Sequence, residues 1–231
     1  MISFVVPAYN EELCIRSCLD AIHAAMKEVG GDYEIVVADD ASTDATAAIA
    51  REAGARVVHV ENRQISKTRN DGAREAKGDR LVFVDADTRV NAAVIRSTVA
   101  ALDSGAVGGG AMPEFDAGAP RYALRMLSRI AAFMRWMRYA AGCYVFCRRE
   151  DFEAIGGFDE RHFAAEEIVL SRALKRRGRM EILPERVLTS ARKFANRSYG
   201  QTVWIHLKLL AQGIRGVRRR EATQFWYDGK R

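Results

Sequence analysis

The stretch "RLVFVDADTRV", residues 80–90, decides the fold class of this chain. It opens with the apolar run Leu81 to Val84, which is typical of a strand buried on both faces of a parallel sheet. Asp85 and Asp87 follow at once, with only Ala86 between them. Carboxylates at the rim of a core are costly to desolvate unless something neutralises them. The stretch therefore predicts that a cation binds where the strand ends.

Three similar strands precede this one, at 2–6, 33–38 and 56–60, and helical patterns at 11–29, 43–53 and 66–77 separate the four. This alternation predicts an α/β fold with right-handed crossovers and a doubly wound, mostly parallel sheet flanked by helices. Each strand is followed by a polar turn, such as "PAYNEE", "DDASTD" or "ENRQISKTRN". Because ligands bind beyond the carboxyl ends of the strands in such sheets, we expect one site at this edge.

The rest of the chain continues without a visible linker. A thin, glycine-rich strand is expected after Gly105, a long helix over 121–141, a strand in "GCYVFCRR" and a helix over 165–177. A further strand after residue 179, the irregular stretch "TSARKF" and a helix over about 199–212 complete the expected elements. We therefore expect a single domain over 1–231.

Composition places the chain among globular proteins, with 231 residues, 48% hydrophobic and 29% charged. The N-terminus lacks a basic region before its short apolar run, so neither a signal peptide nor a membrane span is predicted there and a cytoplasmic location is expected. The four cysteines lack the spacing of zinc or redox motifs, and no histidine cluster accompanies them. They are interpreted as buried, reduced thiols.

Phosphate-binding loops of the common kinds are missing from the sequence. It contains neither Gly-x-Gly-x-x-Gly after the first strand nor a Walker-type Gly-Lys-Ser/Thr. Asp85 and Asp87 lie two residues apart, so they can point the same way and share a divalent ion. Mg²⁺ typically binds one or two carboxylates together with substrate phosphates. A metal-bridged phosphate site is therefore the expected alternative.

Several segments, in order, resemble family 2 of the inverting GT-A glycosyltransferases: "FVVPAYNEE", "VVADDASTDAT", "NRQISKTRNDGAREAKGDRLVFVDADTRV" and "FCRREDFEAIGGFDERHFAAEEIVLSRALKRRG". The resemblance implies a GT-A fold and transfer of a sugar from a UDP-, GDP- or dTDP-sugar to an acceptor hydroxyl. It also implies that Mg²⁺ or Mn²⁺ binds through Asp85 and Asp87. On this basis residues 1–104 form a nucleotide-sugar-binding half, 105–190 an acceptor-binding half and 191–231 a basic helical extension.

By the same resemblance, five residues outside the Asp-Ala-Asp motif help to bind the nucleotide-sugar. Asp40 is expected to accept a hydrogen bond from the base, pyrimidine or guanine, and Arg69 to hold the donor side of the pocket. The Asp85-Ala86-Asp87 motif completes the donor site. Gln64 and Lys67 depart from the family pattern. The residues expected to line the nucleotide pocket are Pro7, Tyr9 and Glu11.

The catalytic base is expected in "AAEEIVL", at Glu166 or Glu167. Neighbouring residues on a helix diverge by about 100°, so only one of the two can face the site well. Alignment with the aspartate of the family favours Glu167. His162 lies close in sequence and has two interpretations, an acceptor contact or a loop residue.

Charge is distributed unevenly behind the net value of +6. Residues 1–120 carry 12 Lys and Arg against 19 Asp and Glu, whereas residues 172–231 carry 16 against 4. The 121–141 helix has five arginines and no acid, which fits either a helix lying in an anionic membrane interface or one covering the sheet with snorkelling arginines. Arg192 and Lys193 are candidates to meet a donor or acceptor phosphate.

The basic segments make a lipid-linked acceptor and a place at the inner face of the cytoplasmic membrane plausible. Nucleic acid is not expected as a partner, because aromatic interleaving and recognised nucleic-acid folds are absent. Two functions compete with sugar transfer: nucleotidyl transfer, and a catalytically silent, membrane-associating binding module on the same fold.

Overall fold

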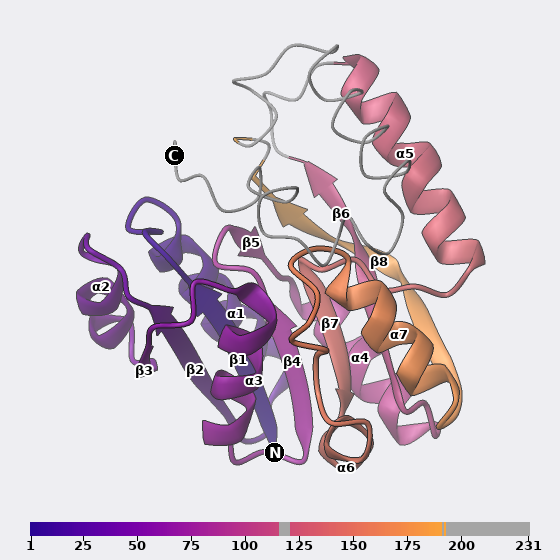
Figure 1. Ribbon diagram of the computed structural model, residues 1–231, viewed down its shortest axis with the longest axis horizontal. Helices are drawn as coiled ribbons and strands as arrows, with labels where there is room; N and C mark the ends of the chain where they lie inside the picture. Colours follow the sequence, from indigo (N-terminus) through magenta and orange to yellow (C-terminus); the bar gives the residue numbers. More distant parts are fainter. Residues whose placement is uncertain (116–120, 191, 193–231) are drawn as a thin grey trace.

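One mixed sheet of eight strands organises the computed structural model, which describes residues 1–115, 121–190 and 192 (Figure 1). The strand order is β3-β2-β1-β4-β7-β6-β8-β5. The strands are β1 (Ile2–Ala8), β2 (Tyr33–Asp40), β3 (Arg56–Val60), β4 (Arg80–Val84), β5 (Thr88–Arg89), β6 (Gly108–Phe115), β7 (Tyr144–Arg148) and β8 (Met180–Thr189). The helices are α1 (Ile15–Val29), α2 (Thr46–Glu52), α3 (Ile65–Glu75), α4 (Ala92–Asp103), α5 (Arg121–Trp136), α6 (Arg149–Ala154) and α7 (Glu166–Lys175).

Strands β1 to β4 are parallel, as the alternating pattern predicts. Their side chains alternate between two hydrophobic layers. Phe4 and Val6 of β1 pack in one layer with α1 and α4, whereas Val5 packs in the other layer with residues of α3, α6 and α7. Burial on both faces explains why these strands are continuous apolar runs in the sequence. Because the four strands are parallel, their carboxyl ends lie at one edge of the sheet.

The second half of the sheet departs from a purely parallel arrangement. Strand β7 runs antiparallel to both β4 and β6, while β6 and β8 are parallel to each other. The glycines of β6 permit close packing here: a Cβ on Gly109 would overlap the carbonyl oxygen of Glu181 in β8 and the ring of Phe146 in β7. The "GGG" run is therefore a requirement of sheet packing.

Two elements were not expected from the sequence, β5 and α4. Helix α4 carries the apolar pattern "AAVIRSTVAAL" and is capped by Asn91, whose side chain accepts a hydrogen bond from the backbone N–H of Val94 at 2.9 Å. Helix α5 ends at Trp136, five residues before the expected end, and α1 starts at Ile15 instead of residue 11. The expected helix over 199–212 lies outside the described residues.

The four cysteines are free thiols, as interpreted from their spacing. Cys18 and Cys147 are buried, and Cys14 and Cys143 are half-buried. Burial raises the pKa of the thiols of Cys18, Cys143 and Cys147 far above its ordinary value. Within the described part of the chain, no helix combines the length and the apolar character that crossing a membrane requires.

Candidate active site

The two carboxylates of the opening stretch project from the carboxyl end of β4. Ala86 is buried in the core at 3% exposure, whereas Asp85 and Asp87 are half-buried. The alternation of side chains therefore places both aspartates on the side away from the core. We call Asp85 and Asp87, at the carboxyl end of β4, the acidic rim. The hydroxyl of Thr189 donates to Asp87 Oδ1 at 3.3 Å, so the end of β8 contacts the acidic rim.

Arg69, from α3, is a buried cation of the site, with 2% of its side chain exposed. Its Nη1 donates to Glu166 Oε1 at 2.6 Å, and its Nη2 donates to Asp85 Oδ1 at 2.7 Å and to the Gly142 carbonyl at 2.8 Å. Burial alone would lower the pKa of Arg69, but Asp85 and Glu166 outweigh burial and raise it. The guanidinium thus joins the β4 rim to the start of α7.

Glu167 lies beside this bridge without forming part of it. A Cβ added to Gly142 would lie 3.6 Å from both Arg69 Nη2 and the carboxyl carbon of Glu167. Burial, and next the charge of Glu166, raise the pKa of Glu167 well above the ordinary value of a glutamate. Arg69 pairs with Glu166, so the two neighbouring carboxyls have different surroundings, and a raised pKa makes Glu167 a candidate for a functional role.

Three residues at the start of α3 hold the loop that leads into α7. Gln64 Nε2 donates to the carbonyls of Glu160 and His162, at 2.5 and 3.2 Å, and the Ser66 hydroxyl donates to the His162 carbonyl at 3.0 Å. Asn70 accepts from the Phe158 N–H and donates to the Phe158 carbonyl, both at 2.9 Å. Gln64, which departs from the family pattern, therefore helps to place Glu166 and Glu167. His162 is a buried loop residue at 3% exposure.

Asp40 fixes the loop between β3 and α3. Its Oδ1 accepts from the backbone N–H groups of Asn62 and Arg63 at 2.7 and 2.8 Å, and its Oδ2 accepts from Thr68 Oγ1 at 2.9 Å and from the Gln64 N–H at 3.2 Å. A carboxylate offers about four lone-pair positions, so a nucleobase would compete with these four donors. The role of Asp40 in base binding stays a prediction.

Asp39, on the opposite face of β2, was missed in the sequence, although it stands next to Asp40 in "DDASTD". It is 1% exposed, and its Oδ2 pairs with His59 Nδ1 at 2.9 Å. Among the residues that the structure describes, its Oδ1 has no hydrogen-bond donor. A buried oxygen without a donor is costly. Asp39, like its neighbour Asp40, is therefore an acid at this edge, and its Oδ1 is suited to accept a hydrogen bond from a ligand.

Tyr9 and Glu11 follow β1 at the same edge, while Pro7 is buried within β1 opposite Ala38. The guanidinium of Arg63 lies over the Tyr9 ring, 4.2 Å from its centroid. This cation–π contact between the loops after β1 and β3 was not expected from the sequence.

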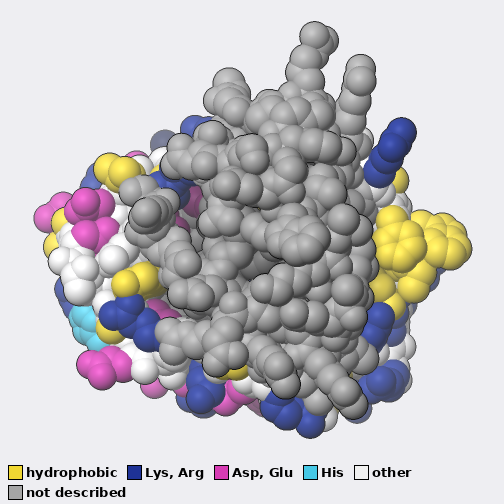
Figure 2. All heavy atoms as spheres, turned by 45° about the horizontal axis from the view of Figure 1, so that its top comes forward, with side chains coloured by type: hydrophobic (Ala, Val, Ile, Leu, Met, Phe, Trp, Pro, Cys, Tyr) yellow, Lys and Arg dark blue, Asp and Glu magenta, His cyan; other side chains and the backbone are white. Residues whose placement is uncertain are grey.

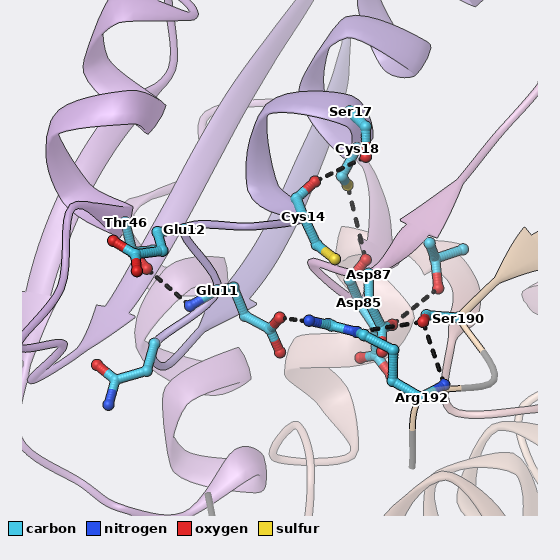
Figure 3. Close-up of polar contacts among 12 residues, drawn as sticks. Glu11, Glu12, Cys14, Ser17, Cys18, Thr46, Asp85, Asp87, Ser190 and Arg192 are labelled. Atoms are coloured by element: carbon cyan, nitrogen blue, oxygen red, sulfur yellow. Dashed lines mark hydrogen bonds and ion pairs between the residues drawn. The ribbon is translucent and has the colours of Figure 1, made fainter. Parts of the chain in front are cut away.

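Glu11 is 5% exposed and pairs with Arg192 at 2.8 Å. Figure 3 shows this pair beside Asp85 and Asp87, with the Cys14 thiol pointing toward them. Burial would lower the pKa of Arg192, but the hydrogen bond and charge of Glu11 outweigh it and raise that pKa. A cation from the chain thus lies against the acidic rim.

Non-glycine residues with left-handed backbone conformations gather around the site. Asn10, Ala41 and Arg63 follow β1, β2 and β3 with φ of 51°, 55° and 49°. Ala165, with φ of 58°, directly precedes Glu166. Such conformations cost on the order of 1–2 kcal/mol each and are typical of functional sites. The folded structure therefore holds these turns, which carry acidic side chains, in backbone conformations that the residues would not adopt on their own.

The described residues contain no group of three or more His, Cys, Asp and Glu side chains arranged to hold a metal ion. Two adjacent carboxylates fit a different kind of site, in which substrate phosphates and water supply the other ligands of Mg²⁺. Asp85 and Asp87 satisfy that requirement, since both are half-buried, acidic and on one side of β4.

Comparison with known proteins identifies the family of this chain. Residues 3–156 match the model of the family described as Glycosyl transferase family 2. The chain belongs to that family. Among curated relatives, this family 2 chain is 34% identical to the uncharacterized glycosyltransferase EpsJ of Bacillus subtilis over 42% of the chain and 28% of EpsJ. It is 37% identical to an undecaprenyl-phosphate 4-deoxy-4-formamido-L-arabinose transferase of Edwardsiella ictaluri over 45% of the chain and 34% of that protein. The matches thus span about a third of these relatives.

Solved structures confirm the GT-A fold expected for this family 2 chain. A mannosyltransferase from Pyrobaculum calidifontis, in complex with GDP-Man and Mn²⁺, superimposes with a TM-score of 0.66 at 22% identity, over 99% of this chain and 65% of that one. S. aureus TarS 1-349, in complex with UDP, gives a TM-score of 0.64 at 22% identity, over 82% of this chain and 60% of that one. At this level of identity the likeness establishes the fold.

Proposed function

We propose that this family 2 chain transfers a sugar from a nucleotide-diphospho-sugar to an acceptor hydroxyl with inversion at the anomeric carbon. One observation carries the proposal: Arg69 contacts both Asp85, at the end of β4, and Glu166, at the start of α7. Glu167, whose pKa is raised, follows Glu166 directly and lies near Arg69, which supports a site shared by Asp85 and Glu167. A diphosphate-binding rim and a general base are the two parts that such a transfer requires.

Asp85 and Asp87 are proposed to hold Mg²⁺ or Mn²⁺ against the donor diphosphate. When bound, the ion would supply positive charge next to the departing nucleoside diphosphate. Tyr9, Glu11 and Arg63 border the same edge and are proposed to surround the nucleoside. Arg192, which follows β8 and pairs with Glu11, is proposed to meet a donor phosphate.

Glu167 is proposed as the general base and Glu166 as the residue that positions it. The acceptor oxygen forms a bond to the anomeric carbon while the bond from that carbon to the diphosphate oxygen breaks, and the hydroxyl proton moves to Glu167. A base works best with a pKa near the operating pH, so the raised pKa of Glu167 suits this role. Arg69 keeps Glu166 in place, because its guanidinium is fixed by two carboxylates and a carbonyl.

The acceptor is proposed to be lipid-linked. Two observations support this. The relatives include an undecaprenyl-phosphate 4-deoxy-4-formamido-L-arabinose transferase and a Drosophila melanogaster dolichyl-phosphate beta-glucosyltransferase, and α5 carries arginines without any acid. An acceptor phosphate would need no base, because it is already ionised at neutral pH. Sensitivity to the loss of Glu167 therefore separates hydroxyl from phosphate acceptors.

Donor-dependent release of nucleoside diphosphate tests the proposal. Purified protein is mixed with UDP-, GDP- or dTDP-sugars and acceptor extracts, in the presence of Mn²⁺, Mg²⁺ or a chelator. We expect release from one donor class, with loss on chelation and in Asp87→Asn. Glu167→Gln should abolish transfer, whereas Glu150→Gln, an exposed acid on α6, should not change it.

Other outcomes identify the competing functions. Release of pyrophosphate from a nucleoside triphosphate and a sugar phosphate would indicate nucleotidyl transfer. Donor binding in a thermal-shift measurement with no release from any donor would indicate a binding module. Full activity of Asp87→Asn would contradict the metal role.

A further inference from the structure

Two aromatic side chains at the C-terminal end of α5 are exposed to solvent. Phe133 is 57% and Trp136 78% exposed, and their ring centroids lie 6.1 Å apart. In the described part of the chain, the other large hydrophobic residues that are exposed are Met1 at 44% and Leu13 at 78%, which lie in the first half of the chain. Figure 2 shows a projecting group of hydrophobic side chains at one edge of the molecule, next to Lys and Arg side chains. We name Phe133, Trp136, Arg129, Arg135 and Arg138 the α5 edge.

The surroundings of the α5 edge are strongly basic. Arg129 and Arg138 are exposed, and Arg135 and Arg138 line an open cavity of about 230 Å³ together with Arg179. The acid of that cavity, Glu181, pairs with Arg179. No acid occurs between residues 121 and 141. Among the described residues, no ion pair joins Arg129, Arg135 or Arg138 to an acid. Exposed aromatic rings beside such arginines match an anionic, partly apolar surface.

We infer that the α5 edge docks on an anionic lipid bilayer. Aromatic side chains such as Trp are favoured at the level of the lipid headgroups, where one end is apolar and the other wet. Each arginine near an anionic leaflet adds attraction that salt screens. The charge complementarity favours lipid over a second copy of this chain, because two copies would bring the arginines of both α5 edges together.

The docking surface is connected to the candidate active site through the segment after α5. Lys175 of α7 donates to the Met137 carbonyl, and Arg172 Nε donates to the Tyr139 hydroxyl at 3.1 Å. Three residues later, the Gly142 carbonyl accepts from Arg69. A bilayer at the α5 edge would therefore present a lipid-linked acceptor on the side of the molecule that carries Glu167. This consequence rests on the proposed function, whereas the docking itself does not.

Co-sedimentation with vesicles tests the docking without donor, metal or acceptor. The full chain is mixed with vesicles of phosphatidylcholine alone or of phosphatidylcholine with phosphatidylglycerol, at low and high ionic strength. We expect binding to the anionic vesicles that falls as salt rises. Losing one arginine, as in Arg129→Gln or Arg138→Gln, should weaken partitioning roughly fivefold. The double variant Phe133→Ser/Trp136→Ser should weaken it by more than about tenfold.

Matched controls are Leu13→Ser, which removes a hydrophobic residue that is also 78% exposed, and Arg74→Gln on α3. Both should bind as the wild type does, and circular dichroism should show that every variant is folded. Failure to bind anionic vesicles, or equal binding by the aromatic double variant, would overturn the inference. Concentration-dependent dimerisation that the double variant abolishes would assign the edge to a second copy and likewise overturn it. Nucleoside diphosphate release without lipid is measured separately, so loss of docking and loss of catalysis are distinguishable.

Discussion

Arg69 donates from Nη1 to Oε1 of Glu166 at 2.6 Å, across 97 residues of sequence, and both side chains are buried. The same guanidinium holds Asp85, so one side chain of α3 sets the relation between the rim of β4 and the start of α7. A buried charge of this kind is costly unless its partners are placed well. The geometry of the candidate active site thus depends on α3, which itself carries no acid proposed to react.

Replacing Arg69 is expected to damage both stability and activity. Arg69→Met leaves two carboxylates without their cation, and removing one partner of a buried ion pair costs about 3–5 kcal/mol. Urea denaturation should show that loss, and transfer should fall below detection. Arg74→Met, one turn later and 65% exposed, is the control and should change the free energy of unfolding by less than about 1 kcal/mol. A stable, active Arg69→Met protein would contradict the bridging role.

Glu167→Gln is expected to stabilise the protein, and more so at higher pH. The pKa of Glu167 is higher in the folded state than in the unfolded state. At a pH between these two pKa values, Glu167 is protonated in the folded state and ionised in the unfolded state. Stability therefore falls as pH rises through this window, and glutamine removes that loss. Thermal unfolding of the wild type and the variant, compared from acid to neutral pH, should show melting temperatures that diverge as pH rises. Parallel curves would exclude a raised pKa.

The activity of the wild type should rise with pH over the same window. A general base acts in its deprotonated form, so a raised pKa moves the acidic limb of the kcat profile above the range of an ordinary glutamate. Steady-state kinetics in a series of buffers provides the profile. An acidic limb near the ordinary pKa of glutamate would indicate that Glu167 is not the base.

Asn70→Ala is expected to reduce kcat while leaving the donor KM nearly unchanged. Asn70 holds the Phe158 backbone in the segment that leads to α7, so its loss should loosen Glu167, the proposed base, and leave the proposed donor-binding residues in place. The cost in stability is about 1–3 kcal/mol. Asn91→Ala removes the cap of α4 and should cost about 1 kcal/mol without changing kcat. If Asn70→Ala and Asn91→Ala lost kcat equally, the effect of Asn70 would be one of general destabilisation and not of positioning Glu167.

Gly142→Ala should fold normally and change catalysis. Its Cβ would stand in ordinary contact, 3.6 Å, with Arg69 and Glu167, so it adds bulk between the bridge and the base. Gly109→Ala should do the reverse and lower the melting temperature, because its Cβ overlaps the backbone of β8. Unaltered kcat and donor KM in Gly142→Ala would show that the reacting groups do not approach this position.

Features of the fold that depend on local interactions could be predicted from the sequence, whereas those that depend on pairing between distant segments could not. The parallel strands β1 to β4 follow from local apolar runs and from the helices between them, and the GT-A fold from the order of the motifs. Helix α4 was missed although its pattern is local, because the "DADT" turn and the short β5 stand directly before it. The antiparallel direction of β7 could not be predicted, because the local sequence of a strand does not show whether it will pair parallel or antiparallel to its neighbours.

The parts of the candidate site could be predicted from local sequence: a strand that ends in Asp85 and Asp87, an acidic pair at 166 and 167, and the arginines of residues 121–141. Each of these is a matter of composition and spacing within a few residues. Which of these parts lie in contact could be seen only in the folded chain. Arg69 bonds Glu166, Gln64 and Asn70 hold the loop before α7, Asp40 secures the loop after β3, and Phe133 and Trp136 remain exposed. These contacts depend on which side chains are buried and on which hydrogen-bond donors reach the few carboxylate and carbonyl oxygens. Both are settled only when distant segments of the chain pack together in the interior, where hydrogen bonds are strong.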